Sequence, residues 1–326
     1  MGKKIDIFNP QVSHVAKGLE GKVILVYGSN NLGKTVVGTQ MEKPFYLPFE
    51  SGLNAVDGIP YCPINSWADF ISINKQLTSP QTVDQAKELY STIIFDEVEA
   101  ASNYCQDFIC SQYGVRSIGE GNRGYGLWKE YGTEFWKQIN KLIGVGYCVY
   151  FIAHAQEKDG YIRPKGDTRA IDPIINNADI CVYVKSNGVD DNGRIVKSSG
   201  YFMQTDEYFA RSRFDYIDTH IDIFSAENLE KAIVDAIKRQ EEIEGIKAVD
   251  FKQQHEEYTS EKKTYEELME DLQELGEKFV KEDKFEDLTR IVEDVLGTGK
   301  KAADLKKGQE EVIKALIVEL ESELGE

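Results

Sequence analysis

The chain has 326 residues, of which 41% are hydrophobic and 29% are charged, and its formal net charge is −18. This length suits one large domain plus an accessory region, and the apolar content supports a real hydrophobic core. The lack of any run of 18 apolar residues excludes a transmembrane helix, and the negative charge argues against a general nucleic-acid binder, because a polyanion is repelled.

The amino-terminal residues lack the apolar stretch of a signal peptide, so we expect a cytoplasmic protein with no membrane partner. Five cysteines show no C-x-x-C pairing, and Cys62, Cys148 and Cys181 lie in apolar runs. This usage predicts buried free thiols in a reducing compartment, with neither zinc nor disulfides.

The most specific motif lies in residues 21–35, where Gly28, Gly33, Lys34 and Thr35 fit the pattern G-x-x-x-x-G-K-[ST]. An apolar run before it predicts a buried strand and the residues after it a helix, which is the context of a phosphate-binding loop. We expect Lys34 to reach the β- and γ-phosphates and Thr35 to bind Mg²⁺. The predicted nucleotide contacts are Gly28, Ser29, Asn30, Asn31, Leu32, Gly33, Lys34, Thr35 and Val36.

Over residues 1–224, strand-like and helix-like segments alternate, as a parallel sheet with crossover helices requires. We expect strands at 23–27, 44–48, 92–95, 147–153, 180–185, 196–203 and 216–218. We expect helices at 35–41, 67–77, 84–90, 98–113 and 128–142. The segments 114–126 and 156–173 are predicted to be irregular, and turn signals predict a hairpin within 182–203.

Carboxylates follow two of the predicted strands. Asp96 ends an apolar strand that we expect to lie next to the phosphate-loop strand, where its carboxylate would hold Mg²⁺ through water. Glu50 ends the strand after the phosphate-loop helix and could be the catalytic base that polarises the attacking water. Glu97 competes for that role, and the residues alone do not choose between the two.

Polar and basic side chains follow the later strands. His154 and Gln156 come after an apolar strand and could sense the γ-phosphate, although a histidine there is as often a structural hydrogen-bonder. Arg211 and Arg213 are spaced by two, which puts both on one face of a strand. Such a pair is either an arginine finger that reaches a neighbouring subunit or part of an ordinary surface strand.

Two loops interleave basic residues with aromatic ones, a composition that suits single-stranded nucleic acid because charge follows the backbone and rings stack on bases. The candidate DNA-binding residues are Arg123, Arg163, Lys165 and Arg169.

The character of the chain changes after residue 224. Residues 1–224 carry a net charge of −5 and residues 225–326 a net charge of −13. Apolar spacing predicts a helix over 226–246 and amphipathic helices over 265–295 and 306–324, with a linker or exposed helix at about 247–263. A small helical bundle with a charged solvated face is one interpretation, and a tail that binds a protein partner is the other.

Together these features resemble the RecA-like core of the phage nucleotide-binding ATPases, a group that includes phage single-strand-annealing recombination proteins. The resemblance covers about residues 7–240 and rests on the segments 28–35, 45–52, 64–69, 93–96, 124–126, 151–154, 177–179 and 210–213. It implies that the chain binds ATP and Mg²⁺, assembles into a ring or filament, and acts on single-stranded DNA. It also implies that Glu50 is the base and that Arg211 and Arg213 act across a subunit interface.

We therefore expect an α/β, RecA-like P-loop ATPase core with a mainly parallel sheet at residues 1–240. An acidic helical region should follow at 241–326. The expected function is ATP hydrolysis on single-stranded DNA in phage recombination or replication, in the host cell cytoplasm if the protein is phage-encoded. The alternatives are a motor or loader that acts on a protein partner, and a nucleotide-dependent scaffold with negligible turnover.

Overall fold

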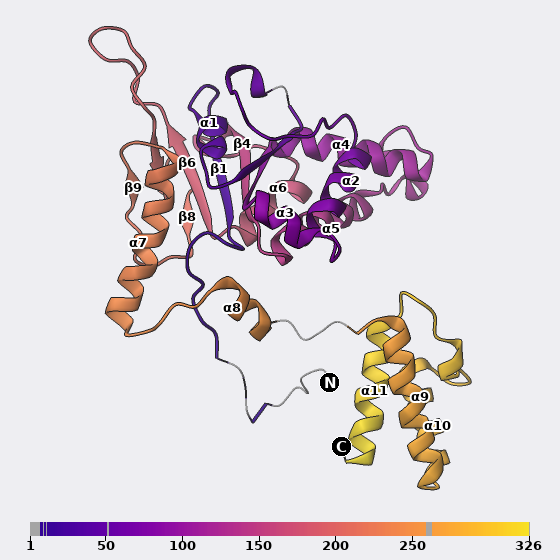
Figure 1. Cartoon of the computed structure of the whole chain (residues 1–326). Helices are drawn as coiled ribbons and strands as arrows, with labels where there is room; N and C mark the ends of the chain where they lie inside the picture. The colour runs from indigo at the N-terminus through magenta and orange to yellow at the C-terminus, as the bar shows by residue number, and fades with distance from the viewer. Residues whose placement is uncertain (1–6, 9, 11, 51, 259–262, 326) are drawn as a thin grey trace. The chain divides into compact units, whose positions relative to one another are not determined.

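A computed structural model describes residues 7–8, 10, 12–50, 52–258 and 263–325 (Figure 1). The described residues fall into two compact units. The larger unit, Ser13–Gln254, contains all the motifs expected to bind nucleotide. The smaller unit takes its helices from the carboxyl-terminal region. No helix of the described residues is long and apolar enough to cross a membrane.

A single sheet of nine strands, counted over the described residues, forms the centre of the larger unit in the order β2-β3-β4-β1-β6-β7-β9. β2, β3, β4, β1 and β6 run parallel, whereas β7 and β8 pair antiparallel with β6, β9 with β7, and β5 with β4. The strands are β1 Val23–Gly28, β2 Pro44–Pro48, β3 Thr92–Asp96, β4 Cys148–Lys158, β5 Tyr161–Pro164, β6 Ile180–Lys185, β7 Ser199–Tyr201, β8 Arg211–Ser212 and β9 His220–Ile221. We call the edge where the parallel strands end the carboxyl edge, and the edge where they begin the amino edge.

Helices cover both faces of this sheet (Figure 1). The helices of the larger unit are α1 Lys34–Thr39, α2 Trp67–Thr78, α3 Val83–Leu89, α4 Val98–Tyr113, α5 Trp128–Gly144, α6 Thr168–Asn177 and α7 Ala226–Glu244. A further helix, α8 Phe251–Tyr258, begins in this unit and spans its boundary at Gln254. Alternate β1 side chains enter different clusters: Leu25 packs with residues of α2, α4, α5 and α6, and Val26 with residues of α1 and α7. Burial on both faces explains the continuous apolar runs of the central strands.

The expected α/β architecture with a mainly parallel sheet is therefore present, but several segments differ in detail. The segment 156–173 is regular: β4 extends to Lys158, β5 pairs back onto it as a hairpin, and α6 follows. Pro173 lies inside α6. Because proline lacks the N–H that an interior helical position donates, the sequence around it does not predict a helix.

The segment 216–218 is not a strand. The Arg239 guanidinium on α7 donates to the Tyr216 carbonyl oxygen at 3.0 Å and to the Asp218 carboxylate at 2.8 and 3.1 Å, which holds this segment in a turn conformation. The hairpin expected within 182–203 is formed by β6 and β7, where Tyr183 pairs with Tyr201. Cys62 is exposed, so its predicted burial is wrong.

The end of the larger unit returns to the amino edge. Val249 forms a parallel bridge with Ala16, and the Phe251 ring occupies the space that a Cβ atom at Gly21 or Gly146 would need. The stretch predicted as a linker or exposed helix therefore contains α8, which begins at Phe251. Residues 259–262 of that stretch lie outside the described residues.

The smaller unit is built from α9 Tyr265–Lys281, α10 Phe285–Leu296 and α11 Glu310–Leu324. A capping box begins α9, with the Thr264 hydroxyl bonded to the Glu267 backbone and the Glu267 carboxylate bonded to the Thr264 backbone. Apolar side chains from α9, α10 and α11 share one core, which includes Phe279, Ile291 and Leu316. The long helix expected over 265–295 is divided into α9 and α10 by a turn.

Candidate functional site

The phosphate loop, residues 28–35, lies at the carboxyl edge between β1 and α1. Its backbone needs both motif glycines. A Cβ atom at Gly28 would lie 2.5 Å from the Val184 carbonyl oxygen, and Gly33 has a φ of 82°, which L side chains rarely adopt. Residues 29–31 at the crown of the loop are exposed and thus accessible to a ligand.

Lys34 is 6% exposed, and its ammonium folds back against the loop. The Nζ atom donates to the carbonyl oxygens of Gly28 at 3.0 Å and Ser29 at 2.7 Å. Burial lowers the pKa of Lys34, and the carboxylates of Asp96, Glu97 and Glu50 oppose that shift. The cation is thus held inside the loop by carbonyl acceptors that phosphate oxygens could replace.

Thr35 and Asp96 meet at the same edge. The Thr35 hydroxyl donates to Asp96 Oδ2 at 2.7 Å, although β3 does not adjoin β1 as expected, because β4 lies between them. The two side chains still meet because all three strands end at this edge and α1 packs across both β4 and β3. A hydroxyl and a carboxylate are oxygen ligands of the kind that Mg²⁺ prefers, so this pair fits a magnesium ion.

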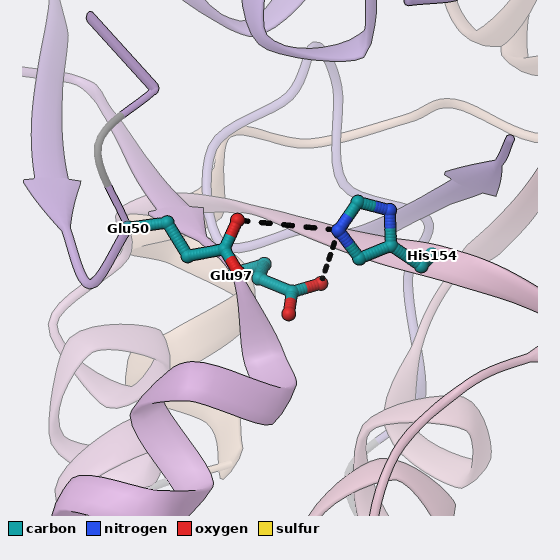
Figure 2. A group of neighbouring side chains, drawn as sticks. All are labelled: Glu50, Glu97 and His154. Carbon is teal, nitrogen blue, oxygen red and sulfur yellow. Dashed lines mark ion pairs between the residues drawn. The ribbon is translucent and has the colours of Figure 1, made fainter. Parts of the chain in front are cut away.

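Glu50, Glu97 and His154 form a second group beside the loop (Figure 2). His154 Nε2 lies 3.3 Å from Glu97 Oε2 and 3.9 Å from Glu50 Oε2. Ligand atoms of the three residues all lie within 4.8 Å of one another, so the group could also hold a cation. The register explains the position of His154, which pairs with Gly28 of the phosphate loop.

The two glutamates differ in their surroundings. The Glu97 side chain is 4% exposed, whereas that of Glu50 is 45% exposed. Burial, followed by the charge of Glu50 and a hydrogen bond to it, raises the pKa of Glu97 to about 8. Burial thus favours the protonated form of Glu97, whereas the Glu50 side chain is partly open to solvent.

His154 and Gln156 do not share one environment. The Nδ1 atom of His154 is buried and has no hydrogen-bond partner among the described residues. Gln156 lies two residues further along β4, in the part that pairs with β5, and its side chain donates to the Pro164 carbonyl oxygen at 3.3 Å. The Gln156 side chain is thus bonded within the β4–β5 hairpin, whereas His154 lies beside the phosphate loop.

The basic loop residues have different partners. Arg163 pairs with Asp172 at 3.4 Å, and Lys165 pairs with Glu99 at 2.8 Å. The Arg169 guanidinium lies 4.6 Å from the centre of the Trp128 ring. This contact connects the segments after β4 and before α5, the two that were predicted to bind DNA. In the earlier loop, Arg123 is exposed and Tyr125 is 84% exposed.

Arg211 and Arg213 lie at the amino edge, away from the phosphate loop of their own chain. Their guanidiniums donate to the carbonyl oxygens of Ile175 at 3.3 Å and Asn176 at 2.9 Å, which caps the end of α6. Arg213 also pairs with Asp179 at 3.6 Å. A role of the two arginines at the site of another subunit stays a prediction.

Sequence reasoning missed one polar group of this site. The Tyr46 hydroxyl donates to Asp96 Oδ2 at 2.9 Å, on the same oxygen that Thr35 contacts. Tyr46 was interpreted only as part of the apolar run 44–48. The available signal was the hydroxyl, since a buried tyrosine hydroxyl usually has a hydrogen-bond partner.

Comparison with known proteins supports the loop assignment. Residues 20–214 match a family model described as "AAA domain". A protein of Bacillus subtilis (strain 168), the SPbeta prophage-derived uncharacterized protein YorG, is 53% identical over 323 residues, which cover 99% of each chain. The matched range contains the phosphate loop, β3 and β4, and it ends just after Arg213.

Proposed function

The chain belongs to the AAA domain family of P-loop ATPases, and from this premise we propose that it hydrolyses ATP with Mg²⁺ at the carboxyl edge of its sheet. One observation carries the proposal: the Thr35 hydroxyl on the phosphate loop lies 2.7 Å from Asp96 Oδ2. Near this pair, Glu50, Glu97 and His154 supply groups that can handle a proton.

Binding of the nucleotide uses the phosphate loop. Lys34 Nζ exchanges the carbonyl oxygens of Gly28 and Ser29 for phosphate oxygens, which keeps the ammonium hydrogen-bonded throughout. The backbone N–H groups of the loop add further donors. Thr35 and Asp96 would hold Mg²⁺, which when bound would supply positive charge to the phosphates.

Glu50 is the base in this proposal. Its carboxylate is exposed enough to contact a water molecule. One of its oxygens accepts the proton as that water attacks the γ-phosphorus, while the bond from this phosphorus to the β–γ bridging oxygen breaks and ADP leaves with that oxygen. Glu97 is buried, so its carboxylate is less accessible to a water molecule than that of Glu50. His154 Nε2 lies beside both carboxylates, where it orients them and responds to the phosphate.

We further propose that the chain couples this ATP hydrolysis to action on single-stranded DNA in phage recombination or replication. The prophage origin of the Bacillus subtilis relative favours a phage setting. Arg169 stacked on Trp128, with exposed Arg123 and Tyr125 in the adjoining loop, supplies cations and rings suited to a single strand. Lys165 contributes less, because Glu99 already neutralises it.

The proposed RecA-like chain assembles into a ring or filament, in which Arg211 and Arg213 would contact the nucleotide of a neighbouring subunit. Their place at the amino edge of the sheet favours a role in trans over one in their own site. Each would have to give up its α6 carbonyl contact to do so.

A second candidate is a motor or loader that acts on a protein partner, and the separate, acidic carboxyl-terminal unit favours it. A nucleotide-dependent scaffold with negligible turnover is a third. Phosphate release from ATP, measured with and without poly(dT), separates the three. DNA-stimulated hydrolysis supports the DNA role, unstimulated hydrolysis supports the protein-directed motor, and absence of hydrolysis despite nucleotide binding supports the scaffold.

The proposed DNA surface has a matched test. Arg123→Glu combined with Arg169→Glu should weaken poly(dT) binding and flatten its dependence on salt, since fewer counterions are released. Lys238→Glu on α7, another exposed charge reversal, is the control and should leave binding unchanged. An unaltered salt slope in the double variant would place the DNA surface elsewhere.

A further inference from the structure

Tyr46 connects β2 to the magnesium end of the proposed site. The residue is fully buried, and it pairs with Ile94 of β3, so its ring can reach along β3 to Asp96. The phenol donates to Asp96 Oδ2 at 2.9 Å, and the Thr35 hydroxyl donates to the same oxygen at 2.7 Å. Two donors from different elements therefore fix one carboxylate oxygen.

The turn that carries Glu50 packs against this hydrogen-bonded pair. The backbone N–H groups of Phe49 and Glu50 donate to the Asp96 carbonyl oxygen at 2.9 and 3.2 Å. A Cβ atom at Gly52 would overlap the Tyr46 hydroxyl and would lie 3.2 Å from Asp96 Oδ2. The absence of a side chain at Gly52 is thus what leaves room for the phenol.

We propose that Tyr46 is a positioning residue for Mg²⁺–nucleotide: its hydroxyl holds the Asp96 carboxylate toward Thr35, and Gly52 provides the space for that hydroxyl. The inference rests on the proposed function, since it assigns Tyr46 a role in the metal dependence of nucleotide binding. A phenylalanine would fill β2 equally well, so packing alone does not account for the hydroxyl. A hydrogen bond to a charged carboxylate is among the stronger kinds.

Tyr46→Phe in the full chain tests this role by binding of ADP, with no turnover required. In EDTA, ADP should bind the variant as it binds the wild type, because the phosphate loop is intact. The Mg²⁺ concentration that gives half of the metal-dependent gain in ADP affinity should rise about tenfold. Gly52→Ala, which retains the phenol but displaces it, should shift the Mg²⁺ midpoint in the same direction.

Tyr147→Phe is the matched control. Tyr147 is equally buried, and its hydroxyl donates to the Leu77 carbonyl oxygen at 3.0 Å, next to the amino end of β4. Its loss should lower thermal stability as the loss of any buried hydrogen bond does, yet leave the Mg²⁺ midpoint unchanged.

The possible outcomes separate this inference from the proposed function. A wild-type chain whose ADP binding responds to Mg²⁺, with Tyr46→Phe and Gly52→Ala both showing the wild-type midpoint, would overturn only the role of Tyr46. A wild-type chain that binds no ADP would overturn the proposed function and this inference together. If Tyr46→Phe does not fold, Gly52→Ala alone decides by its midpoint.

Discussion

The two edges of the central sheet use charged side chains in different ways. At the carboxyl edge, Lys34 and the Thr35–Asp96 pair are held by contacts that phosphate or a metal ion could replace. At the amino edge, the Asp179 carboxylate accepts from the Val23 backbone N–H at 2.8 Å, and Lys22 donates to the Ala16 carbonyl oxygen at 2.9 Å. The charged side chains at the carboxyl edge are therefore available to a ligand, whereas those at the amino edge hold elements of the fold together.

This difference teaches that a buried charge does not by itself mark a functional site. Lys22 and Lys34 are almost equally buried, and burial lowers the pKa of both. What separates them is the neighbourhood: Lys34 lies in an exposed loop beside several carboxylates, whereas Lys22 lies against backbone that it stabilises. Substitutions at the carboxyl edge should therefore change activity. Those at the amino edge should change stability, apart from substitutions of Arg211 and Arg213, which we propose act at the site of another subunit.

The largest expected effect on activity is that of Lys34→Ala. Loss of the cation that faces the phosphates should reduce hydrolysis by about 10³-fold. The Lys34 side chain is also buried, so its removal leaves two loop carbonyls without their donor. Phosphate release measures the first effect and thermal unfolding the second. Hydrolysis at the wild-type rate would refute the assignment of the loop.

Glu50→Gln should reduce hydrolysis by about 10²-fold or more while ATP still binds, since the amide cannot accept the proton of the attacking water. Glu97→Gln is the matched variant and should reduce hydrolysis less, because the buried Glu97 carboxylate is less accessible to the attacking water than that of Glu50. Single-turnover phosphate release, with ATP affinity measured in parallel, compares them. A larger loss of hydrolysis in Glu97→Gln than in Glu50→Gln would make Glu97 the base in place of Glu50.

Asp179→Ala should affect stability and spare the nucleotide site. Its removal leaves the buried Val23 N–H without an acceptor, which should lower the free energy of unfolding by about 1–3 kcal/mol. Asp172→Ala, which breaks an exposed pair with Arg163, should cost less than about 1 kcal/mol. Urea unfolding measures both changes, and a reduced ATP affinity in Asp179→Ala would contradict the division between the edges.

The smallest expected effect on nucleotide binding is that of removing the carboxyl-terminal unit. A chain that ends at residue 262 keeps Phe251 in its place against Gly21 and Gly146, so ATP affinity should not change. Loss of the acidic helices should tighten binding to poly(dT) at low salt, and the gain should fade as salt screens the charge. A truncated chain that no longer binds ATP would show that α9–α11 contribute to the nucleotide site.

Much of the candidate site could be predicted from the sequence, because motif spacing is local and parallel strands bring their ends to one edge. Lys34, Thr35, Asp96, Glu50 and His154 could each be placed by that rule. The expected adjacency of β1, which leads into the phosphate loop, and β3, which ends at Asp96, was wrong, since strand order depends on long-range packing that a single sequence does not contain.

Other features depend on tertiary partners and could not be predicted. The antiparallel pairing of β8 with β6 sets the distance of Arg211 and Arg213 from the phosphate loop. A strand of only two residues does not specify that pairing in the sequence. The role of Tyr46 depends on a partner 50 residues away in the chain. Residues in an apolar strand are naturally interpreted as core, and only the structure gives the hydroxyl its partner.

Hydrogen–deuterium exchange of the full chain, with and without ATP and Mg²⁺, tests the division between the two edges most directly. Nucleotide should slow exchange of the backbone amides in residues 29–36 and around Asp96, because the phosphate loop closes on the ligand. Peptides around Ala16 and Lys22, which meet at the amino edge, should exchange at the same rate in both conditions. Protection confined to the amino edge, or no protection of the phosphate loop at saturating ATP, would contradict the account.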